Sequence, residues 1–539
     1  MESTNWIKIG AIFFVIGFIL ILISWIFTYP IYISNINEIT FTQFYPILWP
    51  GIVICLLALF IILYYCKSKT IAAICCSVIP LFLYVFSFFF SYIPSSDSGA
   101  ARGMFQVFYK TGLNSRVNPY FEFPNYFSLN EIIHQVVGFN EIGIALISFT
   151  LYEVLLGLFL YLFFFNLMKE QYIQFMPFLM VFIYFIGTFS FLNYQWVPQT
   201  LALVYFFLLI YVSTYMLSNP IKTKWNFLFV FLFIPLLFTH PFLPVIFLLF
   251  VGILTIKRRY LLSILLVMVS LYLIWTIYHT TINFQIYTAT FEQSINGFSG
   301  QYVSSVSRSF SETGGLTDQI ISFINRITIP MIWIVSSIGI LILFLKKKIN
   351  PVLISLGSAG FLYLSVGIFY SVLGLRAIQI LFIPLTIGFM FFIIKWKKPS
   401  VVFIVFILVL SVFGPMRTAY NNTQFQTNED AVACDFLGTK IVNVTNAKVA
   451  LSQVNWGYST SKYKFLTDSA IRPGSSRFLF FKDSLNQKEY IVYNSNLGKE
   501  ILEYVLTKEQ LNSKVRDFNF NNKIYDVGTT FVIKGISRT

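Results

Sequence analysis

Long apolar runs follow one another from residue 6 to residue 416 and limit what this chain can fold into. Each run is about 20 residues long, the length that an α-helix needs to cross a hydrocarbon core of ~30 Å. A helix also satisfies its backbone hydrogen bonds within one segment, as lipid requires. We therefore predict a polytopic α-helical membrane protein with about thirteen spans, at residues 6–28, 46–66, 71–93, 142–167, 173–191, 196–217, 225–239, 241–256, 260–282, 327–345, 351–372, 376–394 and 400–416.

Basic residues recur in every second connection between these spans. Cytoplasmic loops of membrane proteins carry an excess of Lys and Arg, so the pattern predicts a cytoplasmic N-terminus and a C-terminus outside, in the cell membrane. Because much of the net charge of +15 then lies in short loops facing anionic lipid, we expect membrane lipid and no nucleic acid as a partner. The residues concerned are Lys8, Lys67, Lys69, Lys169, Lys222, Lys224, Lys257, Arg258, Arg259, Lys346, Lys347, Lys348, Lys395, Lys397 and Lys398.

The tail from residue 417 differs from the rest of the chain because charged residues and short β-branched runs replace the long apolar stretches. The strand-like runs are Lys448–Leu451, Tyr490–Tyr493 and Thr529–Ile533, and Gly498–Val515 has the spacing of an amphipathic helix. We predict two domains: a transmembrane domain at 1–416 and a small soluble α/β domain at 417–539. The orientation above makes the second domain extracytoplasmic.

Two loops of the transmembrane domain, 94–141 and 283–326, are too long to be simple turns, and both are predicted to lie outside. Segment 94–141 has helix-like stretches at 98–112 and 126–138. The second stretch places Phe127, Ile132 and Ile133 on one side, which suits a helix lying at the membrane surface. Between the two stretches, the aromatic and proline-rich residues 118–124, with Glu122, form either a sugar-stacking wall or a buried turn.

Asp97 is the most informative single residue of the outer loop. It directly follows the predicted span 71–93, in the sequence SSDSGAARG. A carboxylate at this boundary can accept a proton from a hydroxyl group, or hold a divalent cation such as Mg²⁺ or Mn²⁺ beside a lipid phosphate. It can equally cap the helix predicted at 98–112.

Several further residues at outer ends of spans have side chains suited to phosphate or sugar. The guanidinium groups of Arg102, Arg116, Arg326 and Arg376 can grip a phosphate, or can simply reach towards the membrane surface. His240 lies in a short connection between two spans and can bind phosphate or sugar, or cap a helix. Gln199 belongs to an unusually polar start of a span, Tyr194–Gln199, which faces a cavity or anchors the helix at the interface through its Trp.

Glu153 stands inside the predicted span 142–167, where a charge is costly. It is either a functional residue or a protonated acid that is hydrogen-bonded within the bundle.

The order of these features resembles the GT-C superfamily of lipid-linked-sugar glycosyltransferases, and in particular its prokaryotic and archaeal members with a C-terminal outer domain. An acidic residue directly follows a membrane helix and precedes an outer loop with two surface helices, further spans and an outer α/β tail. The residues that carry the likeness are Asp97, Gly99–Gly103, Tyr120–Pro124, Leu129–Gly138, Val197–Gln199, Thr239–Pro241, Leu375–Arg376 and Lys523–Gly528.

The resemblance implies transfer of a sugar from a polyprenyl-phosphate donor, at the outer leaflet and with inversion, to a lipid, glycan or protein acceptor. Asp97 would act as general base or cation ligand. Arg102, Arg376 and His240 would bind the phosphate, and Arg116, Glu122 and Gln199 would complete the substrate site. The sequence departs from the family in two ways: two spans precede the one before Asp97, and the acidic pair common in that loop is a single Asp flanked by serines.

Other classes of protein fit the same sequence. An O-antigen polymerase or ligase-like enzyme would have a similar number of spans and would use 283–326 as its large loop. A transporter or flippase without covalent chemistry would use charged residues within spans, such as Glu153. A scaffold with an outer recognition domain is a further alternative. The chain has no Walker motif, which argues against ATP-driven transport.

Overall fold

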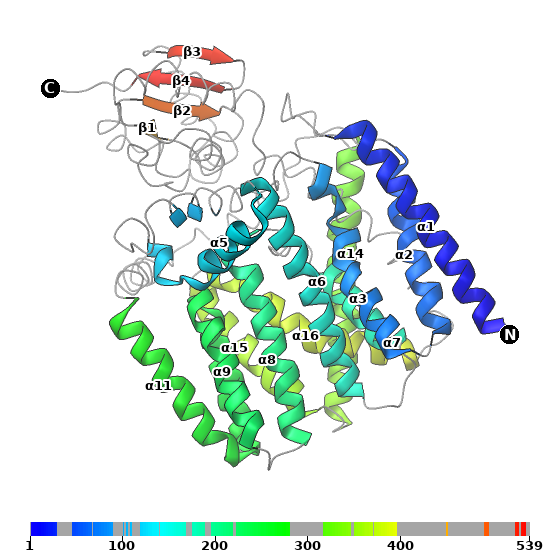
Figure 1. Ribbon diagram of the computed structural model, residues 1–539. Helices are drawn as coiled ribbons and strands as arrows, with labels where there is room; N and C mark the ends of the chain where they lie inside the picture. The colour runs from blue at the N-terminus through cyan, green and yellow to red at the C-terminus, as the bar shows by residue number, and fades with distance from the viewer. Residues whose placement is uncertain are drawn as a thin grey trace.

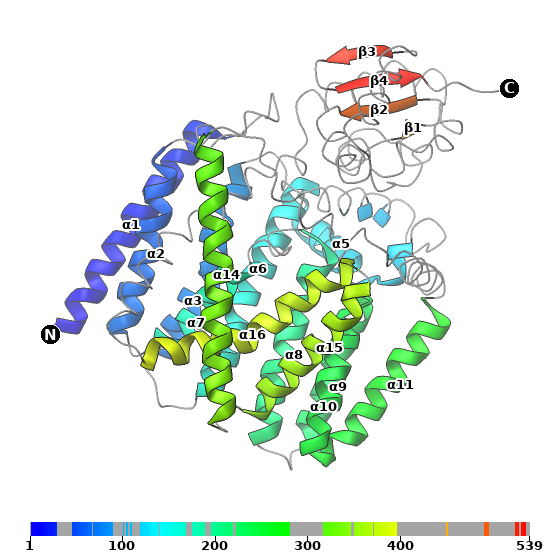
Figure 2. The same ribbon diagram turned by 180° about the vertical axis from the view of Figure 1, so that it is seen from behind.

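The computed structural model describes most of the region up to residue 395 and four strands of the tail. The described residues are 2–29, 46–66, 68–89, 101, 104–105, 108–109, 119–139, 141–168, 175–188, 196–218, 223–280, 316–346, 350–369, 371–395, 449–450, 490–494, 523–527 and 530–534. Most of the helices stand side by side in a bundle, and α5 lies across one end of it (Figures 1 and 2).

Helices occupy the positions that the apolar runs predicted. Each predicted span from 6–28 to 376–394 overlaps a helix, and the last predicted span, 400–416, lies outside the described residues. The α-helices are α1 (Glu2–Thr28), α2 (Leu48–Tyr65), α3 (Lys69–Leu83), α5 (Asn125–Val137), α6 (Glu141–Met168), α7 (Phe175–Gly187), α8 (Pro198–Ser218), α9 (Thr223–Thr239), α10 (Leu243–Lys257), α11 (Leu262–Tyr278), α14 (Leu316–Leu345), α15 (Pro351–Phe369) and α16 (Ser371–Lys395). Short 3₁₀ helices are η3 (Val85–Phe89), η4 (Pro119–Glu122) and η5 (Arg259–Leu261).

Length and composition identify this chain as a helical membrane protein. Among the described residues, 5 helices are long and apolar enough to cross a membrane: Thr4–Thr28, Leu48–Tyr65, Gly143–Met168, Pro198–Leu217 and Arg259–Tyr278. Seven shorter apolar helices accompany them: Lys69–Leu83, Met176–Gly187, Trp225–Thr239, Leu243–Lys257, Pro330–Leu345, Pro351–Ser365 and Ala377–Ile393.

Two predicted spans differ from the helices that form. The span predicted at 71–93 is broken, because α3, which contains Pro80, ends at Leu83 and continues as the 3₁₀ helix η3. A proline removes one backbone hydrogen bond from a helix and weakens it locally. In contrast, α14 begins at Leu316, well before the predicted residue 327, so Arg326 lies within a helix and not at its start. Hydropathy marks only the apolar part of a helix, and residues 316–326 are largely polar.

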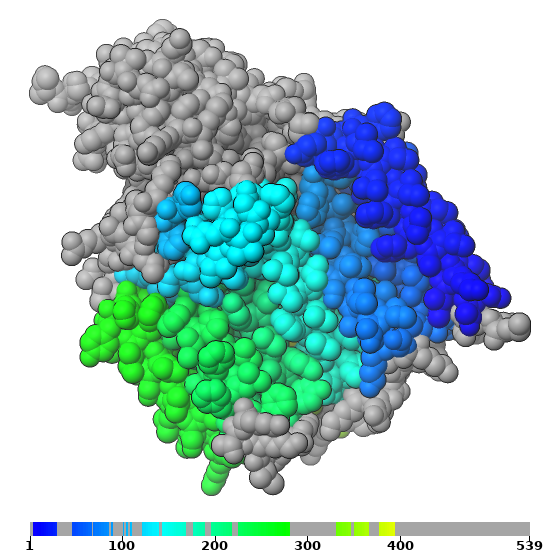
Figure 3. Space-filling view, in the orientation of Figure 1, coloured from blue at the N-terminus to red at the C-terminus, as the bar shows by residue number. Residues whose placement is uncertain are grey.

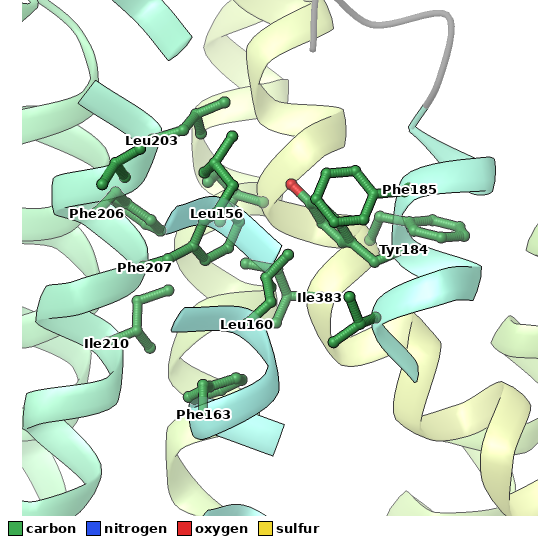
Figure 4. Close-up of a cluster of buried hydrophobic side chains, with 14 of the residues drawn as sticks. Leu156, Leu160, Phe163, Tyr184, Phe185, Leu203, Phe206, Phe207, Ile210 and Ile383 are labelled. Atoms are coloured by element: carbon green, nitrogen blue, oxygen red, sulfur yellow. The ribbon is translucent and has the colours of Figure 1, made fainter. Parts of the chain in front are cut away.

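Aromatic and branched side chains fill the interior between α6, α7, α8 and α16 (Figure 4). The ring of Tyr184 on α7 meets the ring of Phe207 on α8 edge to face, with centroids 5.5 Å apart. Because lipid tails are as apolar as the side chains, dispersion contacts and close packing hold such helices together. The edges of the bundle are different: α1 and α11 leave Ile26, Phe27 and Ile277 exposed, and Figure 3 shows these two helices at opposite margins of one face.

Basic residues gather at one end of the bundle. At one end, Lys69 at the start of α3 has its Nζ 4.7 Å from the ring centroid of Phe165, near the end of α6. Lys346, after α14, lies similarly over Phe391 near the end of α16, at 5.7 Å. In the ribbon views the α10–α11 junction, with exposed Arg258, lies at the same end (Figures 1 and 2). We call this the basic end and the opposite one the α5 end.

The described part of the tail forms a four-stranded sheet in the order β1-β2-β4-β3. Its strands are β1 (Val449–Ala450), β2 (Tyr490–Asn494), β3 (Lys523–Val527) and β4 (Thr530–Lys534). β1 pairs parallel with β2, and the other pairs are antiparallel, with Val492 opposite Val532. Three of these strands match the β-branched runs of the sequence, while β3 was not predicted. The helix predicted at 498–515 lies outside the described residues.

The crossing of α14 and α16 gives a test of the packing. A Cβ atom on Gly339 would collide with the backbone of Gly388, and one on Gly388 with the backbone of Ser336, so a larger residue would force one helix backbone to move. We expect Gly339→Ala to lower the free energy of unfolding by about 1–3 kcal/mol, the usual cost of overpacking. The measurement is thermal unfolding in detergent.

Gly252→Ala is the matched control, because a Cβ there has its nearest neighbour, Leu265 Cδ2, at 3.9 Å. An equal melting temperature for the two variants would contradict this account of the crossing.

Candidate functional site

The first turn of α5 is bonded to two helices of the bundle. Asn125 donates from Nδ2 to Thr239 Oγ1 at 2.7 Å, at the end of α9. Tyr126 donates from Oη to the carbonyl of Trp196 at 3.2 Å, just before α8. Burial raises the pKa of the Tyr126 hydroxyl well above its ordinary value, so the group remains a donor at neutral pH. Two consecutive residues thus fix α5 across the ends of α8 and α9.

The second turn of α5 is bonded to α6 through Asn130. This side chain is fully buried, donates from Nδ2 to the Tyr126 carbonyl at 2.7 Å and accepts from Tyr152 Oη at 3.3 Å. Both ends of the amide therefore have a partner, which a buried amide needs. The surface helix predicted at 126–138 is confirmed as a helix, but the prediction that Phe127 and Ile132 lie on the same side is wrong. Phe127 is buried, whereas Ile132 is exposed, because α5 packs through Tyr126, Phe127 and Asn130.

Aromatic rings join α5 to the described residues of segment 98–112. These residues, Ala101, Met104, Phe105, Phe108 and Tyr109, are helical, and all but Tyr109 are buried. The Phe105 ring lies edge-on to Trp196 at 6.0 Å, and the Phe108 ring stacks on Phe127 at 5.6 Å. Positions spaced by three and four residues turn one face of this segment towards α5, as expected of a helix.

Residues 121–123 form a buried turn, one of the two alternatives expected for this segment. η4 spans Pro119–Glu122, and the rings of Phe121 and Phe123 are buried. Phe121 meets Phe127 of α5 edge to face at 5.2 Å. Glu122 lies between these two aromatic residues and is itself buried, only three residues before Asn125. The turn therefore brings a carboxylate to the junction of α5 and α9.

His240 caps α10, which was one of the two roles expected from the sequence. Its Nδ1 accepts hydrogen bonds from the backbone N–H groups of Phe242 at 3.2 Å and Leu243 at 3.4 Å. A nitrogen that accepts must be unprotonated, so in the neutral ring the proton is on Nε2. The imidazole is 4% exposed. Any contact of His240 with a phosphate or sugar would therefore be made by Nε2.

Gln199 faces the interior and pairs with a helix that is distant in the sequence. Its Nε2 donates to Gln379 Oε1 of α16 at 2.9 Å, and both amides are buried. Trp196 is also buried, so the start of α8 is not an exposed interfacial anchor. Arg376 is one turn before Gln379 on α16. The backbone of Arg376 is therefore at the same end of the bundle as Gln199 and the start of α8.

These contacts form a continuous chain across the α5 end. It runs from His240, which follows α9, and Thr239, the last residue of α9, through Asn125 and Tyr126 on α5. It continues to Trp196, just before α8, and to Gln199 of α8 and Gln379 of α16. Of the seven site residues predicted from sequence, Glu122, Gln199 and His240, with the backbone position of Arg376, gather at this end. Asp97, Arg102 and Arg116 lie outside the described residues.

Three amide side chains at the α5 end were not singled out in the sequence: Asn125, Asn130 and Gln379. Gln379 could have been found, because an amide inside an apolar span usually hydrogen-bonds to a neighbouring helix. In contrast, Asn125 and Asn130 stand in a mixed polar segment, where nothing in the sequence indicates their partners.

No metal centre forms among the residues that the structure describes, since no three His, Cys, Asp or Glu side chains there are grouped to hold an ion. Asp97, the predicted cation ligand, is outside those residues. Cys55, Cys66, Cys75 and Cys76 are buried free thiols.

Comparison with known proteins gives no family assignment. No protein-family model matches the chain, and no curated protein matches its sequence.

The two nitrogens of His240 can be tested separately. In His240→Asn, the side-chain oxygen Oδ1 would lie near the place that Nδ1 occupies in the histidine and could accept the same hydrogen bonds. In His240→Gln, the longer side chain would put its amide near the place of Nε2 instead. We expect His240→Asn to keep the cap on α10, and His240→Gln to lower the free energy of unfolding by about 0.5–2 kcal/mol, the range for a lost helix cap. Thermal unfolding of the purified variants measures the difference. If His240→Asn melted no higher than His240→Gln, the capping role would be contradicted.

Proposed function

We propose that this protein is a membrane-embedded glycosyltransferase. It would move a sugar from a polyprenyl-phosphate donor to a lipid, glycan or protein acceptor, with inversion, at the outer leaflet. The observation that supports the proposal most is the set of hydrogen bonds across the α5 end, because it joins Gln199 to α16 and fixes α5 to the end of α9 next to His240. Glu122 precedes α5 by three residues, and Arg376 precedes Gln379 by one turn on α16.

The chemistry of the proposed reaction assigns a role to each group. A single displacement at the anomeric carbon needs the acceptor hydroxyl to lose its proton while negative charge builds on the leaving phosphate. Asp97 is the proposed base, or the ligand of a divalent cation. Arg102, Arg116, Arg376 and Nε2 of His240 are the proposed donors to the phosphate, since guanidinium groups match its oxygens. Glu122 and Gln199 would bind the sugar hydroxyls.

The membrane setting supports a lipid-linked donor. The α5 end, opposite the basic end, would face the outside if Lys and Arg mark the cytoplasm, as the positive-inside rule states. Ile132, Val136, Val137 and Phe139 are exposed on or just after α5, and such apolar groups suit a helix at the lipid surface. A polyprenyl chain would stay in the bilayer while its phosphate reaches the α5 end. The arrangement of about thirteen spans with an extracytoplasmic α/β domain at 417–539, shaping acceptor access, is part of this proposal.

A transporter or flippase is the second candidate, and one observation favours it. Glu153 is fully buried within α6, among helices that span the membrane. Intramembrane acids frequently mark ion or proton pathways.

The direct test is sugar release from polyprenyl-phosphate donors by the purified protein. We expect Asp97→Asn to lose about 10²–10⁴-fold in turnover, the usual contribution of a general base. Arg376→Ala should also lower turnover, because charge on the leaving phosphate would no longer be stabilised.

Gln135→Ala is the matched control, because Gln135 is exposed on α5 and, among the described residues, bonds within that helix to Glu131, at 2.8 Å. Turnover by Asp97→Asn equal to that of the unaltered protein would remove Asp97 from catalysis. Failure to release sugar from any such donor would favour transport.

A further inference from the structure

Positive charge gathers where α10 meets α11, in a part of the sequence that has no acids. From residue 171 to residue 291 there is no Asp or Glu, so α8, α9, α10 and α11 carry no acidic side chain, and neither does α15, which packs on α10. The basic residues of the same stretch are Lys222, Lys224, Lys257, Arg258 and Arg259. The last three are exposed at the α10–α11 junction and form no ion pair with a residue that the structure describes.

The acids of the whole basic end are too few to neutralise its charge. The segments predicted on this side of the membrane contain two acidic residues, Glu2 and Glu170, against the fifteen basic residues named above. Pairing with these two acids would leave most of the positive charge without a partner. The counter-charge at this end must therefore come largely from outside the chain.

The backbone of the α10–α11 junction is held in place by hydrogen bonds. The N–H of Arg258 donates to the carbonyl of Leu254 in α10 at 3.0 Å, and its carbonyl accepts from the N–H of Leu261 at 2.9 Å. Tyr260 donates from Oη to the carbonyl of Met216, near the end of α8, at 3.3 Å. The three basic side chains therefore project from a turn that is fixed to α10 and to α8. Binding to groups that are already in position costs less entropy.

Two other lysines at the same end are engaged with aromatic rings of the bundle. The Nζ atoms of Lys69 and Lys346 lie 4.7 Å and 5.7 Å from the ring centroids of Phe165 and Phe391. Such cation–π contacts hold an ammonium group against its own protein. The basic residues 257–259 make no contact of this kind with a described ring. Their charge differs from that of the two lysines in being presented to the surroundings.

Exposed apolar side chains flank the three charges. Ile256, directly before them, is 81% exposed, and Leu262, the first residue of α11, is 50% exposed. Leu266 continues the same face one turn later and is 58% exposed. A phospholipid presents a charged phosphate next to acyl chains, which is the order of groups that this surface complements. A soluble anion would leave the apolar face of α11 unused.

Aromatic pairs place the junction at the level of lipid head groups. Tyr215, near the end of α8, stacks on Trp225, near the start of α9, with ring centroids 5.6 Å apart. At the same end of the bundle, Trp6 of α1 stacks on Tyr65 of α2, also at 5.6 Å. Trp and Tyr are enriched where hydrocarbon meets water. The basic residues 257–259 therefore lie where lipid phosphates would be.

We propose that the α10–α11 junction is a binding site for an anionic phospholipid of the leaflet at the basic end. Arg258 and Arg259 donate hydrogen bonds to the phosphate oxygens, which the guanidinium group matches in shape, and Lys257 adds a third positive charge. An acyl chain lies against Ile256 and the exposed face of α11. The site is at the opposite end of the bundle from the candidate functional site. It does not rest on sugar transfer and would stand if that proposal failed.

Native mass spectrometry of the full-length protein tests the site. The protein in detergent is mixed with equal amounts of phosphatidylglycerol and phosphatidylcholine that have the same acyl chains, so that the head group alone differs. We expect phosphatidylglycerol to be the main lipid retained. Each basic residue near an anionic lipid surface contributes about fivefold to binding. Arg258→Gln/Arg259→Gln should therefore lower the ratio of bound phosphatidylglycerol to bound phosphatidylcholine by about 25-fold.

Lys69→Gln/Lys346→Gln is the matched control, because it removes the same charge from the same end at two side chains that lie over rings. It should keep the preference for phosphatidylglycerol. An equal loss of preference in both double variants would overturn the proposal, since net charge alone would then explain binding. Equal retention of the two lipids by the unaltered protein would overturn it as well.

Glycerol 3-phosphate, added at the concentration of the lipid, distinguishes a lipid site from a site for free phosphate. It carries the same charged group without acyl chains, so we expect the bound phosphatidylglycerol to stay in place. Displacement of the lipid by this compound would contradict the part assigned to Ile256 and α11.

Discussion

The attachment of α5 to the bundle is the interaction on which the rest of the α5 end depends. Asn125 and Tyr126 bond to the end of α9 and to the residue before α8, and Asn130 bonds to α6. Asn130 is fully buried, so leaving its amide without a partner would be costly. The same bonds hold α5 to the end of α9, next to His240, and to the residues before α8, next to Gln199. The contacts that hold α5 on the bundle are therefore also the contacts that position the candidate functional residues.

The sequence predicts where helices form, because spanning a membrane restricts both the length and the composition of a segment. It also picks out polar residues that make defined contacts, since His240 caps α10 and Gln199 pairs with Gln379. It does not predict pairing across the bundle, since the partners of Asn125 and Gln199 are 114 and 180 residues away. The buried side of α5 was predicted in part wrongly, because it too depends on contacts with residues that are distant in the sequence. Apolar spacing identifies an amphipathic helix, but the packing of Phe127 and Asn130 decides which side is buried.

The central claim is that the α5 end faces outside while the basic end faces the cytoplasm. Labelling with a membrane-impermeant maleimide tests it, using Gln135→Cys on α5 and Arg258→Cys at the α10–α11 junction, both at exposed positions. Each is made in a Cys434→Ser background, because the other four cysteines are buried. The account predicts that Gln135→Cys reacts on intact cells and that Arg258→Cys reacts only after permeabilisation. The reverse pattern, or reaction of both on intact cells, would contradict it.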